Sequence, residues 1–208
     1  MAYTFDDTLL DSGPLGINGT GMNYSYSAFG RVNRSLALLD NPSYVQATGL
    51  LLLGTDAYPY SLSVWIKPTV ITQGTIVQVS ASGSGWCISM LGFTSSGEIL
   101  AQSWNSGSVN VTGPAAVLNV WSHIAVTYES ANGLRLWVNG SQHGMATDAF
   151  NFTAANTAVT ITLGSSINGT HPCASGGISD GQYVGYMDDF RLYSRELSAS
   201  DILALSES

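Results

Sequence analysis

The chain has 208 residues and a formal net charge of −8, with six lysines and arginines against fourteen acidic residues. Nucleic acid is excluded as a partner, because its phosphates require clustered cations and none appear in the sequence. Membrane insertion is also excluded, because the longest apolar run, residues 50–53, is far shorter than the ~20 residues that span a bilayer.

Alternating apolar and polar residues predict that almost all of the regular structure is β. Strands are expected at residues 61–67, 75–80, 85–91, 98–104, 122–129, 134–139, 141–145, 159–163 and 183–193. Glycine-containing turn signals separate several of them, at residues 82–85, 95–97, 131–133 and 139–140. Many short strands with frequent turns are typical of an all-β, antiparallel two-sheet jelly-roll sandwich.

One short helix is expected at the C-terminal end of the chain. Ser198 is the predicted N-cap and Asp201 the third helical residue, followed by the apolar Ile202, Leu203 and Leu205. Neither a linker nor a convincing internal repeat interrupts the chain, so we expect a single domain over residues 1–208.

Glycosylation signals favour a secreted or cell-surface protein. Charged residues make up only 10% of the chain, so Ser, Thr, Asn and Gly, together with any attached sugar, must provide much of the polar, hydrated surface. The Asn-x-Ser/Thr signals, each of which also implies a surface position, are at Asn18, Asn23, Asn33, Asn110, Asn139, Asn151 and Asn168. Chance occurrence in an Asn-, Ser- and Thr-rich chain is the alternative.

The two cysteines, Cys87 and Cys173, are candidates for one disulfide, which would persist in an oxidising compartment. Two buried free thiols are the alternative, because the sequence does not fix their separation. Residues 1–2 lead directly into a strand-like segment, with no signal peptide before it. We therefore expect a fragment of a larger protein.

Two segments are more specific than this general pattern. Residues 121–128 (WSHIAVTY) and 134–140 (LRLWVNG) resemble the central hairpin of laminin-G-like jelly rolls, which belong to the concanavalin A-like lectin/glucanase superfamily. Residues 185–198 (GYMDDFRLYSRELS) resemble the closing strand and terminal helix of that family, and residues 61–68 an early strand. The resemblance implies one jelly roll over nearly the whole chain. It does not fix the function, because the superfamily includes lectins, adhesion modules, enzymes and spacers.

Catalysis is not expected. Retaining glycosidases on this kind of sandwich carry a strand of the type Glu-x-Asp-x-Glu, which places two carboxylates about 5 Å apart. None of the glutamates has that spacing: Glu98, Glu129, Glu196 and Glu207. The histidines are isolated in sequence: His123, His143 and His171. A glycan-active enzyme is therefore the weakest reading of the chain.

Aspartates near both ends of the chain predict a Ca²⁺ site, because calcium binds hard oxygen ligands. The residues are Asp6 and Asp11, beside Asp7, and Asp188 in the last strand, which lies where Met187 and Phe190 break the alternation and indicate a bulge. The resemblance implies the same, since acidic residues at these positions often hold calcium in the family. The alternative is that Asp188 accepts backbone hydrogen bonds and that Asp7 and Asp11 are solvated turn residues.

Aromatic side chains on the polar side of the strands predict a sugar-binding platform, because an indole stacks on the apolar face of a pyranose. The candidates are Trp65, Trp104, Trp137 and, on the same strand face as Trp137, Arg135. If the strands are adjacent, Ala125 and Thr127 would leave a shallow trough between Trp65 and Trp137. The alternative is that loops cover these indoles.

These observations together favour an extracellular ligand-binding module that calcium stabilises. Carbohydrate is the expected ligand class, and an extracellular protein is the alternative partner. The contrasting reading is a structural or adhesive spacer without a small-molecule site.

Overall fold

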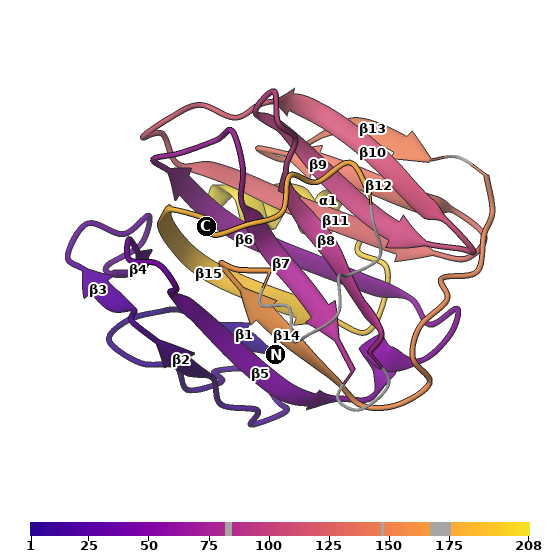
Figure 1. The fold of residues 1–208 in the computed structure, drawn as a ribbon, viewed down its shortest axis with the longest axis horizontal. Coiled ribbons are helices and arrows are strands. Elements are labelled where there is room, and N and C mark those ends of the chain that lie inside the picture. Colours follow the sequence, from indigo (N-terminus) through magenta and orange to yellow (C-terminus); the bar gives the residue numbers. More distant parts are fainter. Residues whose placement is uncertain (82–84, 147, 167–175) are drawn as a thin grey trace.

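The structure is a computed structural model of the chain, and it describes residues 1–81, 85–146, 148–166 and 176–208. Two antiparallel sheets pack face to face (Figure 1). The order of the first sheet, sheet A, is β13 (Ser141–Ala146), β12 (Gly133–Val138), β11 (Ser122–Glu129), β6 (Tyr60–Pro68), β15 (Gly185–Tyr193), β4 (Ser35–Leu38) and β3 (Ser25–Ser27), and β1 (Ala2–Tyr3) also pairs with β15.

The order of the second sheet, sheet B, is β10 (Ser108–Ala115), β9 (Glu98–Trp104), β8 (Cys87–Phe93), β7 (Thr75–Ser80), β14 (Val159–Leu163), β5 (Tyr44–Leu50) and β2 (Thr20–Met22). A short 3-10 helix, η1 (Leu52–Gly54), follows β5, and the C-terminal helix α1 spans Ala199–Glu207. The predicted jelly-roll sandwich with one short C-terminal helix is confirmed. All nine predicted strands are present, within two residues at either end.

The core lies between the inner faces of the two sheets. In β6 every second side chain, Leu62, Val64 and Ile66, is fully buried there. The rings of Tyr60 and Tyr128 stack 5.1 Å apart across β6 and β11, and the Tyr128 hydroxyl donates a hydrogen bond to the carbonyl of Phe150. The alternation in β6 therefore places these three side chains in the core and directs the intervening side chains to the outer face of sheet A.

The outer face of sheet A is partly covered by α1, which lies behind the strands in Figure 1. Ser198 caps this helix as predicted, because its side chain accepts a hydrogen bond from the backbone N–H of Asp201 and the Asp201 carboxylate accepts one from the N–H of Ser198. Ile202 and Leu197 pack against Ala125 and Trp137, forming a second, small apolar cluster.

The predicted bulge in the closing strand is present. The register between β15 and β6 shifts between Asp188 and Arg191, and Asp189 has a positive φ of 44°. Because of this extra residue, Asp188 and Arg191 both lie on the outer face, while Met187 and Phe190 lie in the core.

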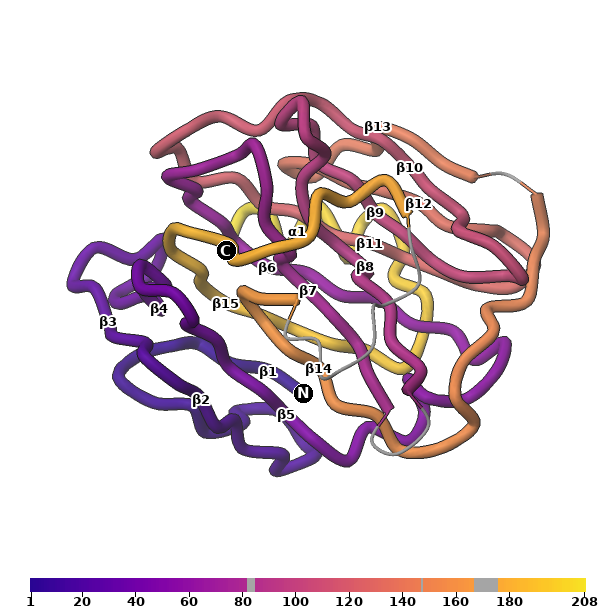
Figure 2. The backbone as a smooth tube through the Cα atoms, in the orientation of Figure 1, coloured from indigo at the N-terminus to yellow at the C-terminus, as the bar shows by residue number. Residues whose placement is uncertain are grey.

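The outer face of sheet B is also partly covered. Residues 176–182 cross in front of its strands (Figure 2) and bond to outward-facing polar side chains. The N–H of Gly177 donates to Gln102 Oε1 at 3.2 Å, and Ser89 Oγ donates to Asp180 Oδ1 at 2.8 Å. In the described part of the chain, no helix is long and apolar enough to cross a membrane.

Candidate functional site

Asp188 binds backbone amides. Its side chain is only 1% exposed. One carboxylate oxygen accepts hydrogen bonds from the N–H groups of Arg31 and Val32, at 2.8 and 3.0 Å, and the other accepts one from Asp189 at 2.8 Å. Burial raises the pKa of Asp188 to about 6, although the three hydrogen bonds act in the opposite direction. Asp188 therefore anchors the loop between β3 and β4.

The other two predicted calcium ligands also bind backbone. Asp11 accepts hydrogen bonds from the N–H groups of Ala2, Gly13 and Ile17. Burial opposes the charge of Asp11, but these bonds prevail and hold its pKa below the ordinary value. Asp6 accepts from the N–H of Arg34 at 3.0 Å.

These carboxylates do not form a calcium-binding set. Among the described residues, no group of three or more His, Cys, Asp or Glu side chains could hold a metal ion. Calcium requires six to eight oxygen ligands around one point. Asp6 and Asp188 both bind N–H groups of the loop between β3 and β4, whereas Asp11 binds N–H groups of the N-terminal segment. The described carboxylates do not fit the ion, and the expected stabilisation by calcium stays untested.

The predicted trough beside Trp137 is not open, which corrects the expectation from the strand pattern. β6, β11 and β12 are adjacent as expected, with Ala125 between Ser63 and Trp137. However, α1 places Leu197 and Ile202 over Ala125 and Trp137, so that Trp137 is only 7% exposed. Its indole N–H donates to Thr127 Oγ1 at 3.1 Å. Apolar packing fills the space that a sugar would need.

Arg135 and Trp104 do not join a common platform either. Arg135 forms an ion pair with Glu196, which also accepts a hydrogen bond from Asn132. Trp104 ends β9 in sheet B, on the opposite layer from Trp65 and Trp137, and packs against the main core. The four predicted ligand-binding residues are therefore not brought together.

Trp65 is covered as well, but by the side chain of a loop residue and not by α1. It lies on the outer face of β6, in register with His123 of β11 and Asp188 of β15. The Arg31 guanidinium lies 4.5 Å from the centre of the Trp65 ring and leaves it 6% exposed. This position of Arg31 depends on Asp188, which binds the Arg31 backbone N–H.

Two buried polar atoms have no hydrogen-bond partner in the described part of the chain at this point. They are the indole Nε1 of Trp65 and the imidazole Nδ1 of His123, whose rings lie 5.3 Å apart. Burial and the nearby Arg191 lower the pKa of His123 to about 4, so the ring is neutral at pH 7. A buried polar atom without a partner costs free energy, so this pair is an energetically costly feature of the outer face of sheet A.

Lys67 and Tyr186 extend this surface by one position along the strands. They are cross-strand partners on β6 and β15, and the Lys67 ammonium lies 5.7 Å from the centre of the Tyr186 ring. Both side chains are partly exposed. We call the set Arg31, Trp65, Lys67, His123 and Tyr186 the outer-face site.

Sequence reasoning missed four of these five residues. Lys67 shares the outer face of a predicted strand with Trp65, so its position was available from the alternation. His123 and Tyr186 lie in predicted strands, but the pattern did not show which strands are neighbours. Arg31 lies in an irregular loop, and only the bonds from its backbone to Asp188 bring it over Trp65.

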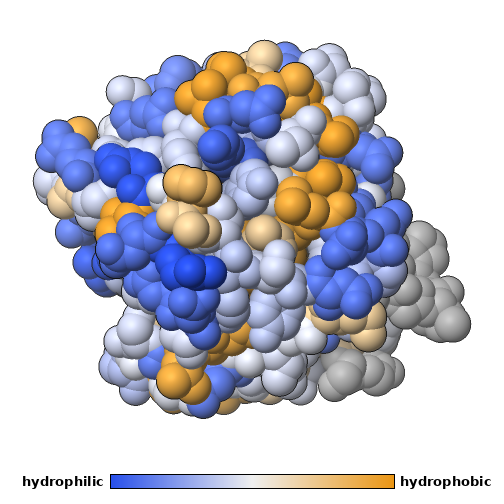
Figure 3. All heavy atoms as spheres, turned by 90° about the vertical axis from the view of Figure 1, so that its left-hand side faces the viewer, coloured by the Kyte–Doolittle hydropathy of each residue, from blue (hydrophilic) through white to orange (hydrophobic). Residues whose placement is uncertain are grey.

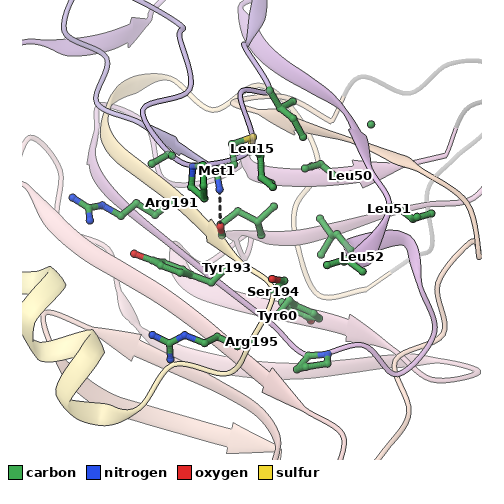
Figure 4. A pocket seen from close by; sticks show the side chains of 18 of the residues that line it. Met1, Leu15, Leu50, Leu51, Leu52, Tyr60, Arg191, Tyr193, Ser194 and Arg195 are labelled. Carbon is green, nitrogen blue, oxygen red and sulfur yellow. Dashed lines mark hydrogen bonds between the residues drawn. The ribbon is translucent and has the colours of Figure 1, made fainter.

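An apolar groove lies elsewhere, between the N-terminal segment, η1 and the end of β15 (Figure 4). It encloses about 660 Å³. Leu50, Leu51 and Leu52 line one side, and Tyr193 and Arg195 lie on the other. It provides contact area for apolar groups but few polar atoms to orient a sugar.

Further hydrophobic side chains are exposed at one end of the sandwich. The loop between β10 and β11 exposes Val117, Leu118 and Val120, and the loop between β3 and β4 exposes Phe29. Figure 3 looks onto this end and shows hydrophobic patches separated by polar surface.

The structure describes most of the residues of the predicted glycosylation sites, and one of the two cysteines of the predicted disulfide. Six of the seven sequon asparagines lie in the described residues, and all six are exposed. Asn168 lies outside the described residues, as do His171 and Cys173. Cys87 is buried at the start of β8. Sugar attachment and the Cys87–Cys173 disulfide stay predictions.

Comparison with known proteins agrees with this architecture. The sequence profile of the concanavalin A-like lectin/glucanases superfamily matches residues 39–203. The chain belongs to this superfamily. The resemblance of residues 121–140 and 185–198 is thereby confirmed, and the concanavalin A-like fold is established. No curated protein is significantly similar to the chain in sequence.

Solved structures share the concanavalin A-like fold at low sequence identity. Domain 4 of AbnA, an extracellular GH43 arabinanase from Geobacillus stearothermophilus solved with arabinotriose, is 19% identical, with a TM-score of 0.66 over 99% of this chain and 96% of that one. The botulinum neurotoxin serotype G binding domain is 18% identical, with a TM-score of 0.65 over 95% and 48% of the two chains. The binding domain of botulinum neurotoxin DC, solved with rat synaptotagmin II, is 16% identical, with a TM-score of 0.65 over 97% and 49%. This chain thus spans about half of each neurotoxin domain.

Proposed function

We propose that the chain is a carbohydrate-binding module of a larger secreted or cell-surface protein, without a catalytic role of its own. The outer-face site carries this proposal. It places the partly exposed ring of Tyr186 beside the Lys67 ammonium, and the exposed Arg31 guanidinium over the ring of Trp65. Sugars present apolar C–H faces beside hydroxyl groups, and this combination suits both.

The structural comparisons support this proposal. Domain 4 of the arabinanase matches the chain over almost its full length and was solved with a sugar. That protein is extracellular, which agrees with the seven sequons as support for a secreted protein. The sequence also carries no Glu-x-Asp-x-Glu strand of the kind that retaining glycosidases use, which agrees with a proposed binding role.

A glycan array of the unglycosylated protein tests the proposal. The wild-type protein should bind a defined set of glycans, and Tyr186→Ala should lose most of that binding because it removes the exposed ring of the site. Tyr44→Ala is the matched control, because Tyr44 is a partly exposed tyrosine at the start of β5 in the opposite sheet. If no glycan binds, or if both variants bind like the wild type, the proposal fails.

The apolar groove supports a second candidate, a module that contacts another protein or a neighbouring domain. Its exposed leucines, Leu15, Leu51 and Leu52, are more than 40% exposed and would gain by burial. Under this reading the array would be empty, and Leu51→Ser would reduce self-association or partner capture without affecting the outer-face site.

A further inference from the structure

All six cationic side chains of this acidic protein gather around one face. The chain carries fourteen acidic residues, yet its lysine and its arginines lie on the outer face of sheet A or on the segments beside it. Lys67 is on β6, Arg135 on β12 and Arg191 on β15. Arg31 and Arg34 precede β4, and Arg195 follows β15. This distribution is not visible in the sequence.

Four of these cations are neutralised by neighbouring carboxylates. The ion pairs are Arg34 with Asp7, Arg135 with Glu196, Arg191 with Asp189 and Arg195 with Asp201. Arg31 and Lys67 form no ion pair with any residue that the structure describes. Both instead lie against aromatic rings, those of Trp65 and Tyr186.

The two unneutralised cations lie against neighbouring outer-face positions of sheet A. Trp65 and Lys67 point to the same side of β6 two residues apart, which is about 7 Å along a strand. The Arg31 guanidinium lies over Trp65, so both cations border one small area of surface. In a protein of net charge −8, such an area attracts anions that the rest of the surface repels.

The carboxylate nearest to Arg31 does not cancel this charge in the way an ion pair does. Asp188 is directed to the backbone: its oxygens accept the N–H groups of Arg31, Val32 and Asp189. Gly30 allows this close approach, because a Cβ there would lie 2.9 Å from Asp188 Oδ2 and 2.5 Å from the carbonyl oxygen of Arg34. The Arg31 side chain remains exposed and available to a ligand.

We propose that the outer-face site binds an anionic saccharide, one whose carboxylate or sulfate group pairs with Arg31 and Lys67. This inference rests on the proposed carbohydrate-binding function and names its ligand class. The sugar ring would pack on the partly exposed Tyr186, beside the Lys67 and Arg31 side chains. An aromatic ring beside two cations favours an acidic saccharide, because the ring packs against the apolar C–H face of a sugar while the cations pair with its anionic group.

The test compares matched neutral and acidic glycans. An array would carry lactose beside 3′-sialyllactose, and neutral oligosaccharides beside uronate and sulfated forms of the same backbone. Acidic glycans should dominate, and their binding should weaken as salt rises. In calorimetric titrations with the best acidic glycan, Arg31→Gln and Lys67→Gln should each lower affinity by about tenfold, because each removes a charge-assisted contact. Binding of its neutral parent should change by less than about twofold.

Arg195→Gln is the matched control, since it removes an equal charge from the same side of the molecule at an arginine already paired with Asp201. It should leave both affinities unchanged, and thermal melts should show that every variant is folded. Acidic binding that survives Arg31→Gln and Lys67→Gln would overturn the inference. Equal binding of neutral and acidic glycans, abolished by Tyr186→Ala, would overturn the inference but leave the proposed function standing. An empty array would overturn both.

Discussion

At the residue scale, Asp188 links the fold to the outer-face site. The sequence singled it out correctly as an aspartate beside a bulge, and of the two explanations given for it, the described contacts favour backbone hydrogen bonds. The carboxylate holds the β3–β4 loop in place through Arg31 and Val32, and this loop carries Arg31 over Trp65. The buried Asp188 carboxylate therefore holds this loop in place, and its burial raises its pKa.

Asp188 should make the stability of the protein depend on pH. Burial raises its pKa to about 6 from the ordinary value of 3.8, so between these values the folded protein holds a proton that the unfolded chain has lost. Stability from this group is thus present at low pH and is lost as pH rises through about 6. Asparagine does not titrate at this position. The free energy of unfolding of the wild type, minus that of Asp188→Asn, should increase by about 1 kcal/mol per unit as pH falls from 6 to 4.

Urea denaturation at several pH values measures this difference, and a difference that is constant between pH 4 and 7 would contradict the account.

The same two proteins test the calcium prediction. Because Asp188 already binds three N–H groups, addition of millimolar calcium or of chelator should leave the melting temperature of both unchanged. A rise with calcium in the wild type alone would restore the metal site.

At the element scale, α1 decides which part of sheet A stays open. Strand alternation placed Trp65 and Trp137 correctly on the outer face, but alternation cannot show what packs there. The helix was predicted down to its N-cap at Ser198, whereas its docking over Ala125 and Trp137 depends on the path of the chain after β15. The partly exposed residues of the outer-face site, Lys67 and Tyr186, therefore lie on β6 and β15, while α1 covers Ala125 of β11 and Trp137 of β12.

Removing the apolar contact of α1 should destabilise the protein. Ile202 is fully buried against Ala125 and Trp137, so Ile202→Ala should lower the free energy of unfolding by about 3 kcal/mol. Leu203 is the next residue and is 48% exposed, so Leu203→Ala should cost less than about 1 kcal/mol. Urea unfolding followed by tryptophan fluorescence compares the two variants. Equal losses would mean that α1 does not dock through Ile202.

Other elements could not be predicted, for identifiable reasons. All four residues of β4 are buried, so no polar position alternates with an apolar one. β2 and β3 have three residues each and expose much of their surface. β10 is an exposed edge strand that contains Pro114, which a pattern search rejects as a strand interior. In each case position within the sheet, rather than local preference, forms the strand.

At the scale of the whole molecule, the sequence was sufficient for the fold class and the superfamily but not for the site. Charge shows the difference most clearly. The count of six cations led to the expectation that nucleic acid is not a partner, yet it gave no sign that these residues converge on one face. Their convergence depends on the order β11, β6, β15 and β4 in sheet A and on a loop anchored by one buried carboxylate.

The central claim is that glycans bind at the outer-face site, and NMR titration of the isotope-labelled protein tests it most directly. The chain has five tryptophans, so the indole N–H signals form a small, assignable set. Adding the best glycan from the array should shift the indole signal of Trp65 and the backbone amides of Arg31, Lys67 and Tyr186. The indoles of Trp137, which lies under α1, and of Trp104, in sheet B, should not move. Shifts confined to sheet B or to the apolar groove, with Trp65 unchanged, would contradict the account.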